Sequence, residues 1–311
     1  MELYYQNLHD INTIVNDELY NKISIVKLKE MTLHALQDGK RLRSIIAYII
    51  SNKIQKKRNQ KININKIIVF VEILHNVSLI IDDLPCMDND TIRRGKPTIH
   101  SKYGEVSAQI LSSYLLTKAF YLLGKNIDEI EEKKHFEKKI LEEKIVEIYK
   151  NITKNLGVTG AAAGQFIDTC PTNPFMEKKE YLSKYNSQEK LEELIYLKTT
   201  TFYEIGFIVP YLISGGEKNN LDKLKEAVRN FGLFFQLSDD FEDVEQDSKK
   251  NLECNPNFIV KFGEEETRKL FFTSVDKFKK IMIELEIYDE VFDEIINYLS
   301  NKVKIQKKND L

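Results

Sequence analysis

Apolar residues recur every three to four positions along most of this chain, and that spacing is typical of amphipathic α-helices. The segment 66–82 is apolar almost all round, which predicts a central helix that packs on several sides. The sequence shows neither strand-like alternation nor an internal repeat, so the pattern predicts an all-α protein. The same helical periodicity extends over residues 10–37, 104–124, 189–214, 221–247 and 265–303.

The composition is that of a folded protein with a well-solvated surface. Its 311 residues are 42% hydrophobic, which is enough for a sizeable core, and we expect one domain over residues 1–311. Glycine (12) and proline (6) are scarce, which disfavours a many-stranded fold. The net charge of -2 comes without a one-sided basic segment, so no nucleic-acid partner is expected. Three widely spaced cysteines predict neither a disulfide framework nor a zinc site.

The sequence predicts no membrane span and no secretory signal. Its most apolar stretch, 67–81, is too short to cross a bilayer and contains Glu72 and His75. The N-terminus lacks a basic region followed by an apolar run, which predicts a cytoplasmic protein, although a transit peptide already removed would leave the same N-terminus. Loops or solvated faces are expected over 52–66 and 125–144, and a frayed tail is expected from Lys302 onward.

An acidic cluster lies in the predicted helix 221–247. Asp239 and Asp243 are four residues apart, so they share one helix face and repel each other unless a cation lies between them. Such a run is usually a solvated acidic surface. Here Phe234 and Phe235 precede it and Phe241 lies inside it, which favours the wall of a cavity that holds metal.

A second acidic cluster follows the apolar helix 66–82. Asp82 and Asp83 stand at its C-terminal end, where the helix dipole disfavours carboxylates unless a cation is bound. Asp88 lies six positions after Asp82, so an irregular turn must bring it back. Magnesium takes one or two carboxylates together with substrate phosphates. The predicted metal ligands are Asp82, Asp88, Asp239 and Asp243.

Basic residues flank both acidic clusters. The segment 39–43, Gly-Lys-Arg-Leu-Arg, places Lys40, Arg41 and Arg43 within four positions. Arginine binds phosphate through two parallel hydrogen bonds and lysine supplies a point charge. Each residue alone is more often a surface ion-pair partner, but beside two acidic clusters they predict sites for two diphosphates. Arg93, Arg94, Lys198 and Thr199 complete this basic and polar set.

These motifs resemble those of the trans-isoprenyl diphosphate synthases, and most of all the geranylgeranyl diphosphate synthase branch, over residues 38–244. The stretch DDLPCMDNDTIRRGKP, 82–97, is similar to the first aspartate-rich motif with its two-residue insertion. FQLSDDFED, 235–243, is similar to the second. The resemblance implies the isoprenoid synthase fold, an antiparallel helical bundle around a deep central cavity, usually homodimeric. Lesser motifs in the matching order are GKRLR (39–43), GQFID (164–168) and KTTTF (198–202).

The resemblance also implies a role for each matching residue. Three magnesium ions would be held mainly by Asp82, Asp88 and Asp239, supported by Asp83, Asp240 and Asp243. The allylic diphosphate would be bound by Arg93, Lys198 and Gln236. Isopentenyl diphosphate would be bound by Lys40, Arg43, His75 and Arg94. Arg41 and Gln165 are counted with the substrate-binding residues and Thr199 with the catalytic ones.

Product length in this family depends on the bulk just before the first aspartates. Val77 and Ser78 stand there and neither is aromatic, which favours a product longer than fifteen carbons. Ser112, Ser113 and Tyr114 on the next helix could set a different floor. All of these could equally be ordinary packing residues.

Several departures from the family pattern leave the reaction open. Ser112-Ser113 replaces a Gly-Asp pair, and the Gly-Lys element that usually follows the second motif is absent, with Lys249 or Lys250 as candidate substitutes. The leading hypothesis is magnesium-dependent, head-to-tail (1'-4) condensation of an allylic diphosphate with isopentenyl diphosphate, which gives a product such as geranylgeranyl diphosphate. The alternative is a terpene synthase that cyclises or hydrates the allylic cation without isopentenyl diphosphate. A third is a non-catalytic regulatory subunit, which the two complete clusters disfavour.

Overall fold

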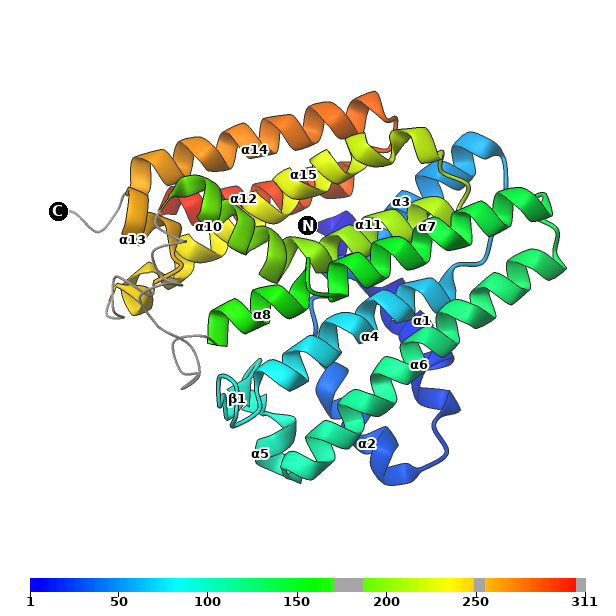
Figure 1. The fold of residues 1–311 in the computed structure, drawn as a ribbon, viewed down its shortest axis with the longest axis horizontal. Helices are drawn as coiled ribbons and strands as arrows, with labels where there is room; N and C mark the ends of the chain where they lie inside the picture. The colour runs from blue at the N-terminus through cyan, green and yellow to red at the C-terminus, as the bar shows by residue number, and fades with distance from the viewer. Residues whose placement is uncertain (170–186, 249–254, 306–311) are drawn as a thin grey trace. The chain divides into compact units, whose positions relative to one another are not determined.

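The computed structural model describes residues 1–169, 187–248 and 255–305, and most of them lie in helices (Figure 1). The chain divides into two compact units. Unit 1 contains residues 1–4, 148–208 and 217–311, and unit 2 contains residues 5–147 and 209–216. The prediction of an all-α protein is confirmed, because the described strands are limited to one short hairpin. Lys249 and Lys250, together with Cys170 and Cys254, lie outside the described residues.

Unit 2 contains the predicted central helix, which the structure places at Asn65–Asp82 (α4). It packs along α6; in Figure 1 α4 is light blue to cyan and α6 is blue-green to green. Its other elements are α1 (Glu2–Glu18, from Tyr5 on), η1 (Tyr20–Lys22), α2 (Val26–Leu36), α3 (Leu42–Arg58), β1 (Ile92–Arg93), β2 (Lys96–Pro97), α5 (Ile99–Tyr103), α6 (Glu105–Glu132) and most of α7 (Lys138–Leu156).

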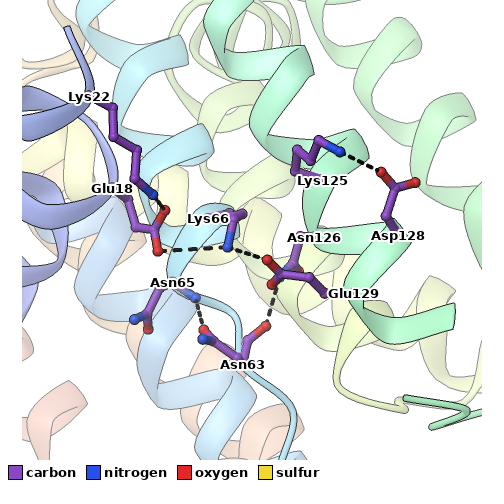
Figure 2. A network of polar contacts seen from close by, with 9 residues as sticks. All are labelled: Glu18, Lys22, Asn63, Asn65, Lys66, Lys125, Asn126, Asp128 and Glu129. Atoms are coloured by element: carbon purple, nitrogen blue, oxygen red, sulfur yellow. Dashed lines mark hydrogen bonds and ion pairs between the residues drawn. The ribbon is translucent and has the colours of Figure 1, made fainter. Parts of the chain in front are cut away.

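The start of α4 is fixed by a polar network that joins α1, α4 and α6 (Figure 2). The Lys66 ammonium lies 2.6 Å from Glu129 on α6 and 3.7 Å from Glu18 on α1. The buried Asn126 donates a hydrogen bond of 2.7 Å to the backbone carbonyl of Asn63, just before the helix. Both neighbouring helices therefore hold the start of α4.

Unit 1 is built around a cluster of buried aromatic rings. Phe231 lies 5.5 Å from Phe207 and 5.3 Å from Phe278, and Phe278 lies 5.3 Å from Phe292, measured between ring centroids. All four are fully buried, so these rings are core residues. Its elements are α8 (Ala161–Thr169), α10 (Gln188–Ile195), the π-helical turn η4 (Tyr196–Thr200), α11 (Thr201–Ile213, to Ile208), η5 (Lys218–Asn220), α12 (Leu221–Asp247), α13 (Phe258–Phe262), α14 (Glu264–Glu284) and α15 (Glu290–Ile305).

The predicted helices 66–82 and 221–247 agree with α4 and α12 to within one residue. The helical periodicity over 10–37 corresponds to the end of α1, to η1 and to α2, with a break at residues 23–25. The helical periodicity over 265–303 corresponds to two helices, since α14 ends at Glu284 and α15 starts at Glu290. The prediction of a frayed tail from Lys302 onward is wrong for residues 302–305, which still belong to α15.

The loop expected within 52–66 is present, although α3 continues to Arg58 and leaves only a short connection to α4. The segment 125–144 contains the end of α6 and the start of α7, joined across residues 133–137. Among the described residues, each helix is too short or too polar to span a bilayer.

Candidate active site

The first aspartate motif lies in unit 2, where α4 ends at Asp82. The expected irregular turn is present: the Asp88 backbone N–H donates to the Asp82 carbonyl at 2.9 Å, and the Asn89 N–H donates to the Leu84 carbonyl at 3.1 Å. The turn absorbs the two extra residues and returns Asp88 to the end of the helix. Asp82 is half-buried and Asp88 is exposed, so both side chains are within reach of solvent and ions.

Asp83 differs from Asp82 and Asp88, because its side chain is buried against Arg93. The Arg93 Nε donates to Asp83 Oδ1 at 2.7 Å, and Arg93 Nη2 lies 2.5 Å from the same oxygen. Burial raises the pKa of Asp83, although the Arg93 guanidinium opposes that rise. The pair therefore orients Arg93 at the motif, and Asp83 acts through Arg93.

The basic residues that follow the first motif form a tight β-hairpin that the sequence did not predict. Strands β1 and β2 pair Arg93 with Lys96, and Arg94 and Gly95 form the two-residue turn, both with positive φ. Glycine favours that conformation, and arginine adopts it less readily. A solvent-open cleft adjoins the hairpin and is lined in part by Asp83, Arg93 and Arg94.

Gly39 lets two guanidinium groups approach the 39–43 segment. A Cβ at this position would lie 3.1 Å from both Arg41 Nη1 and Arg94 Nη1. The three basic residues that follow differ in exposure. Lys40 is exposed, and Arg43 is half-buried in the first turn of α3. Arg41 is buried and has a left-handed backbone conformation with φ 53°. A larger residue at Gly39 would push Arg94 away from this segment.

Arg41 faces the protein interior, although the sequence placed it among the substrate-binding residues. Its Nη1 donates to Glu72 Oε1 at 2.8 Å, and its Nε donates to Asn12 Oδ1 at 3.1 Å. Glu72 also accepts from Ser44 Oγ at 2.7 Å and Asn76 Nδ2 at 2.9 Å. Burial alone would raise the pKa of Glu72, but Arg41 and these two donors lower it. The segment that carries Lys40 and Arg43 is thus anchored by a buried ion pair.

His75 lies on α4, about two turns before Asp82, within the field of these arginines. Burial, together with Arg43, Arg94, Arg93 and Arg41, holds the pKa of His75 well below its usual range. Partial burial and the repulsion of Arg41, Arg93 and Arg43 also lower the pKa of Arg94, against the attraction of Glu72. These shifts indicate a region of strongly positive potential, which suits a polyanionic ligand.

The predicted chain-length residues lie on the neighbouring helices α4 and α6. Val77 and Ser112 are buried, and Ser112 Oγ donates to the Ala108 carbonyl at 2.9 Å. Ser78 is half-buried and donates to the His75 carbonyl at 2.8 Å. Partial burial raises the pKa of Tyr114. Their influence on product length stays a prediction.

The second aspartate motif lies on α12 in unit 1, and its three aspartates differ in surroundings. Asp239 is half-buried and Asp243 is exposed, both on one face as the spacing predicted. Asp240 is turned inward and only 5% exposed. Its Oδ2 accepts from the Phe258 backbone N–H at 2.9 Å, at the start of α13. Asp240 therefore links α12 to α13 instead of facing the same side as Asp239.

A chain of hydrogen bonds joins this motif to the KTTTF segment. Thr199 Oγ1 donates to Gln236 Oε1 at 2.9 Å, and Gln236 Nε2 donates to Asp240 Oδ1 at 3.1 Å. Thr199 and Lys198 lie in the π-helical turn η4, a distortion that often marks functional sites. Gln165 lies half-buried on α8, which packs against η4. The structure thus brings Lys198, Thr199, Gln236 and Asp240 into one connected region.

Two glycines allow neighbouring helices to press on the π-helical turn. A Cβ at Gly164 on α8 would lie 2.8 Å from the Leu197 carbonyl carbon. A Cβ at Gly232 on α12 would lie 2.0 Å from Thr200 Oγ1. The turn is also held by Tyr196, whose hydroxyl donates to the buried Glu204 at 3.0 Å. Close packing on two sides and this buried hydrogen bond fix where Lys198 and Thr199 lie.

Replacing Gly232 by alanine is expected to lower the free energy of unfolding by about 2 kcal/mol, because the added methyl group overlaps Thr200. Gly124→Ala is the matched control: Gly124 lies inside α6, and an added methyl group there would meet nothing within 4 Å, so alanine should be neutral or stabilising. Urea unfolding of both variants measures the difference. Equal stability of the two would contradict the close packing of α12 on η4.

Asp240 makes the stability of metal-free protein depend on pH. Burial, with repulsion from Asp239 and Asp247, raises its pKa to about 7, although Phe258 and Gln236 donate to it. A raised carboxyl pKa means that the folded state holds the proton more tightly than the unfolded chain. The contribution of Asp240 to the free energy of unfolding is therefore fully present below pH 4 and is lost as pH rises through 7. The loss is expected to reach up to about 4 kcal/mol.

Urea unfolding of the chelator-treated chain between pH 4 and pH 8 tests this. Asp240→Asn removes the titrating group, so the decline in stability over this interval should flatten. Asp243→Asn, on the exposed face of the same helix, should keep the wild-type slope. If Asp240→Asn and the wild type show the same slope, Asp240 does not titrate as described.

Sequence reasoning missed several residues of the two regions. Glu72 was noted only as a polar interruption in an apolar helix, yet it anchors Arg41. Asn257 caps α13 by accepting from the Ile259 N–H at 3.0 Å, and it donates to the Asp240 carbonyl at 2.9 Å. An asparagine before Phe-Ile-Val is an N-cap signal that the sequence does contain. Lys302 contacts Asp239, and nothing in its local sequence indicates this.

The donors of both motifs suit a hard cation, because they are carboxylate oxygens. Within the described ranges, no three His, Cys, Asp or Glu side chains gather at metal-binding distance. Magnesium commonly takes one or two carboxylates and fills its other positions with water and phosphate oxygens, so the residues present fit it. Whether the two motifs face each other across a cavity stays a prediction.

With both regions described, comparison with known proteins identifies their class. The family profile of polyprenyl synthetases matches residues 25–253, so this chain belongs to the polyprenyl synthetase family. The predicted family, a family of prenyltransferases, is confirmed. A crystal structure of a geranyltransferase from Helicobacter pylori, complexed with magnesium and isoprenyl diphosphate, matches 97% of this chain and 97% of its own, with a TM-score of 0.71 and 26% identity. The predicted isoprenoid synthase fold is thereby confirmed.

Individual relatives are similar over part of their length. Geranylgeranyl pyrophosphate synthase 4 of Arabidopsis thaliana is 32% identical over 71% of this chain and 54% of its own. The farnesyl diphosphate synthase of Bacillus subtilis is 30% identical over 72% of this chain and 68% of its own. The match thus spans about half of the first relative and two thirds of the second, and these relatives differ in the product their names state.

Proposed function

We propose that this chain catalyses magnesium-dependent ionisation of an allylic prenyl diphosphate and its head-to-tail condensation with isopentenyl diphosphate. The observation that carries this proposal is the positive region of unit 2. Burial, together with Arg43, Arg94 and their neighbours, holds the pKa of His75 well below its usual range, and gathering these charges is costly without a polyanion. An enzyme that only ionised an allylic diphosphate would have no need of this second anion site.

Each group of residues has a distinct task in the proposed reaction. Lys40, Arg43, His75 and Arg94 hold the diphosphate of isopentenyl diphosphate, and Arg93, oriented by Asp83, reaches toward the allylic diphosphate. Lys198 and Gln236 are the other residues assigned to the allylic diphosphate. Magnesium, held by Asp82, Asp88, Asp239 and Asp243, would draw negative charge from the leaving diphosphate. The isopentenyl double bond then attacks the allylic carbon, and a proton passes to the departing diphosphate.

Several finer points belong to the same proposal. We expect about three magnesium ions with bound diphosphate, a single functional domain, a cytoplasmic location and a long product such as geranylgeranyl diphosphate. We also expect a homodimer. Exposed apolar residues on α6 support this, since Val106 is 72%, Ile110 57% and Tyr121 56% exposed.

A product assay on the purified chain with magnesium tests the proposal. The ten-, fifteen-, twenty- and twenty-five-carbon allylic diphosphates would each be supplied with and without isopentenyl diphosphate, and both hydrocarbons and dephosphorylated alcohols analysed by mass spectrometry. Longer prenyl alcohols that form only with isopentenyl diphosphate would support condensation and give the chain length. Cyclic hydrocarbons or terpene alcohols formed without it would establish a terpene synthase instead. No release of diphosphate at all would favour a regulatory subunit.

Arg94→Gln sharpens this assay, because Arg94 is assigned to isopentenyl diphosphate. The variant should raise the KM for isopentenyl diphosphate and leave the KM for the allylic diphosphate little changed. Arg58→Gln is a control at the far end of α3, where Arg58 donates to the Gly215 carbonyl at 3.0 Å. If Arg94→Gln raises the KM for both substrates equally, the positive region does not form a separate site for isopentenyl diphosphate.

A further inference from the structure

A lysine from the C-terminal helix α15 lies against the second aspartate motif. The Lys302 ammonium is 3.3 Å from Asp239 Oδ1 and 2.6 Å from Glu242 Oε2. Its side chain is only 9% exposed and lies beside the ring of Tyr298, with Nζ 5.2 Å from the ring centroid. A lysine that is nearly buried and bridges two carboxylates has a defined position, unlike an ordinary surface pair.

The end of α15 is itself held against the rest of unit 1. Arg268 on α14 donates to the Val303 carbonyl and pairs with Glu264. The Arg268 guanidinium also lies 5.1 Å from the ring centroid of Phe241 on α12. Because α14 and α12 both hold this end of α15, Lys302 is directed to the motif by the fold.

We propose that Lys302 is a tethered counter-ion of the second aspartate motif, which occupies the place of a magnesium ion until a diphosphate arrives. Asp239 is the carboxylate that both cations would use, and an ammonium 3.3 Å from its oxygen repels a metal ion that binds to the same carboxylate. A magnesium ion at Asp239 is therefore bound more weakly while Lys302 keeps this position and more tightly once Lys302 moves away. A diphosphate offers the displaced ammonium new oxygen partners, so metal and diphosphate bind more readily together than either does alone.

This inference rests on the proposed function, because it takes Asp239 as a magnesium ligand. It adds a residue that lies 59 positions beyond the second motif and outside the matched family segment, 25–253. Lys302 is thus a cation at the second aspartate motif that the described structure contains. The earlier candidates for such a charge, Lys249 and Lys250, lie outside the described residues.

Titration of the full chain with Mn²⁺, followed by electron paramagnetic resonance, tests the exchange without depending on activity. Lys302→Met keeps the length of the side chain and removes its charge. Without diphosphate, this variant should bind Mn²⁺ at least about tenfold more tightly than the wild type, since a unit positive charge next to the ligand is gone. Lys302→Arg, which keeps the charge, should behave like the wild type.

The control is Lys304→Met, which removes an exposed lysine two residues further along α15 and should leave the Mn²⁺ affinity unchanged. Addition of inorganic diphosphate should narrow the gap between Lys302→Met and the wild type, because phosphate oxygens then take up the ammonium. Equal affinities of Lys302→Met and wild type without diphosphate would overturn the proposal, and so would a gap that diphosphate leaves unchanged. If the wild type binds no Mn²⁺ even with diphosphate, the proposed magnesium site itself is wrong, and that result is distinct from both.

Discussion

Replacing Asp82 by asparagine is expected to lower the rate of magnesium-dependent diphosphate release about a thousandfold, equivalent to about 4 kcal/mol of transition-state stabilisation. Asp82 is the last residue of α4, and its carbonyl accepts from the Asp88 N–H at 2.9 Å, so it lies at the centre of the turn that gathers the first motif. Asparagine keeps the shape of the side chain and removes the charge. The metal therefore loses its ligand while the turn is retained.

The same substitution should leave the protein at least as stable as before. A carboxylate at the C-terminal end of a helix is repelled by the negative end of the helix dipole, and Asp82 lies there. Release of inorganic diphosphate from an allylic diphosphate measures the rate, and urea unfolding measures the stability. A residue that costs stability and is needed for activity is the combination expected of a metal ligand.

Asp90→Asn is the matched control in the same loop. Asp90 is exposed, and its carboxylate lies 3.4 Å from Arg93, which is a weak surface contact. This variant should keep the rate of diphosphate release within about threefold of the wild type, as surface substitutions away from a site usually do. A comparable loss in Asp90→Asn and Asp82→Asn would mean that the whole loop responds to charge and that Asp82 is no specific ligand.

The helices that were predicted well are those whose pattern is set by burial alone. The segment 66–82 is apolar on nearly every face, and α4 is accordingly buried along its length. The breaks at 23–25 and 285–289 were missed because both helices flanking each break keep an apolar face, so the periodicity continues across the turn. The 92–97 hairpin was missed because two-residue strands show no alternation, although Arg94-Gly95 occupies a turn that glycine favours.

The candidate site was predictable to the extent that function depends on residues close in sequence. The turn between Asp82 and Asp88 followed from counting residues, and the structure contains it. The inward direction of Asp240 did not follow, since it depends on the Phe258 N–H, eighteen residues away. The buried ion pair of Arg41 did not follow for the same reason, since its partner Glu72 lies on another helix. Long-range pairing of this kind leaves no local signal.

Replacing Glu72 by alanine is expected to lower the free energy of unfolding by about 3–5 kcal/mol, because it leaves the charge of Arg41 buried without its carboxylate. Arg41 is 5% exposed and Glu72 is 1% exposed, and Arg41 Nη1 lies 2.8 Å from Glu72 Oε1. The nearby arginines, which already repel Arg94, make the loss more severe. Urea unfolding at pH 7 measures the change. The variant should also lose affinity for isopentenyl diphosphate, since Arg41 anchors the segment that carries Lys40 and Arg43.

Glu30→Ala provides the matched control, because Glu30 pairs with Lys27 at the same distance, 2.8 Å, on an exposed surface. It should change stability very little, since exposed ion pairs contribute little in water. The double variant Arg41→Met, Glu72→Leu should recover much of the stability that Glu72→Ala loses, because no charge is then left buried. It should not recover binding of isopentenyl diphosphate if the ion pair positions Lys40 and Arg43. Recovery of both stability and binding would show that any well-packed pair suffices at these positions.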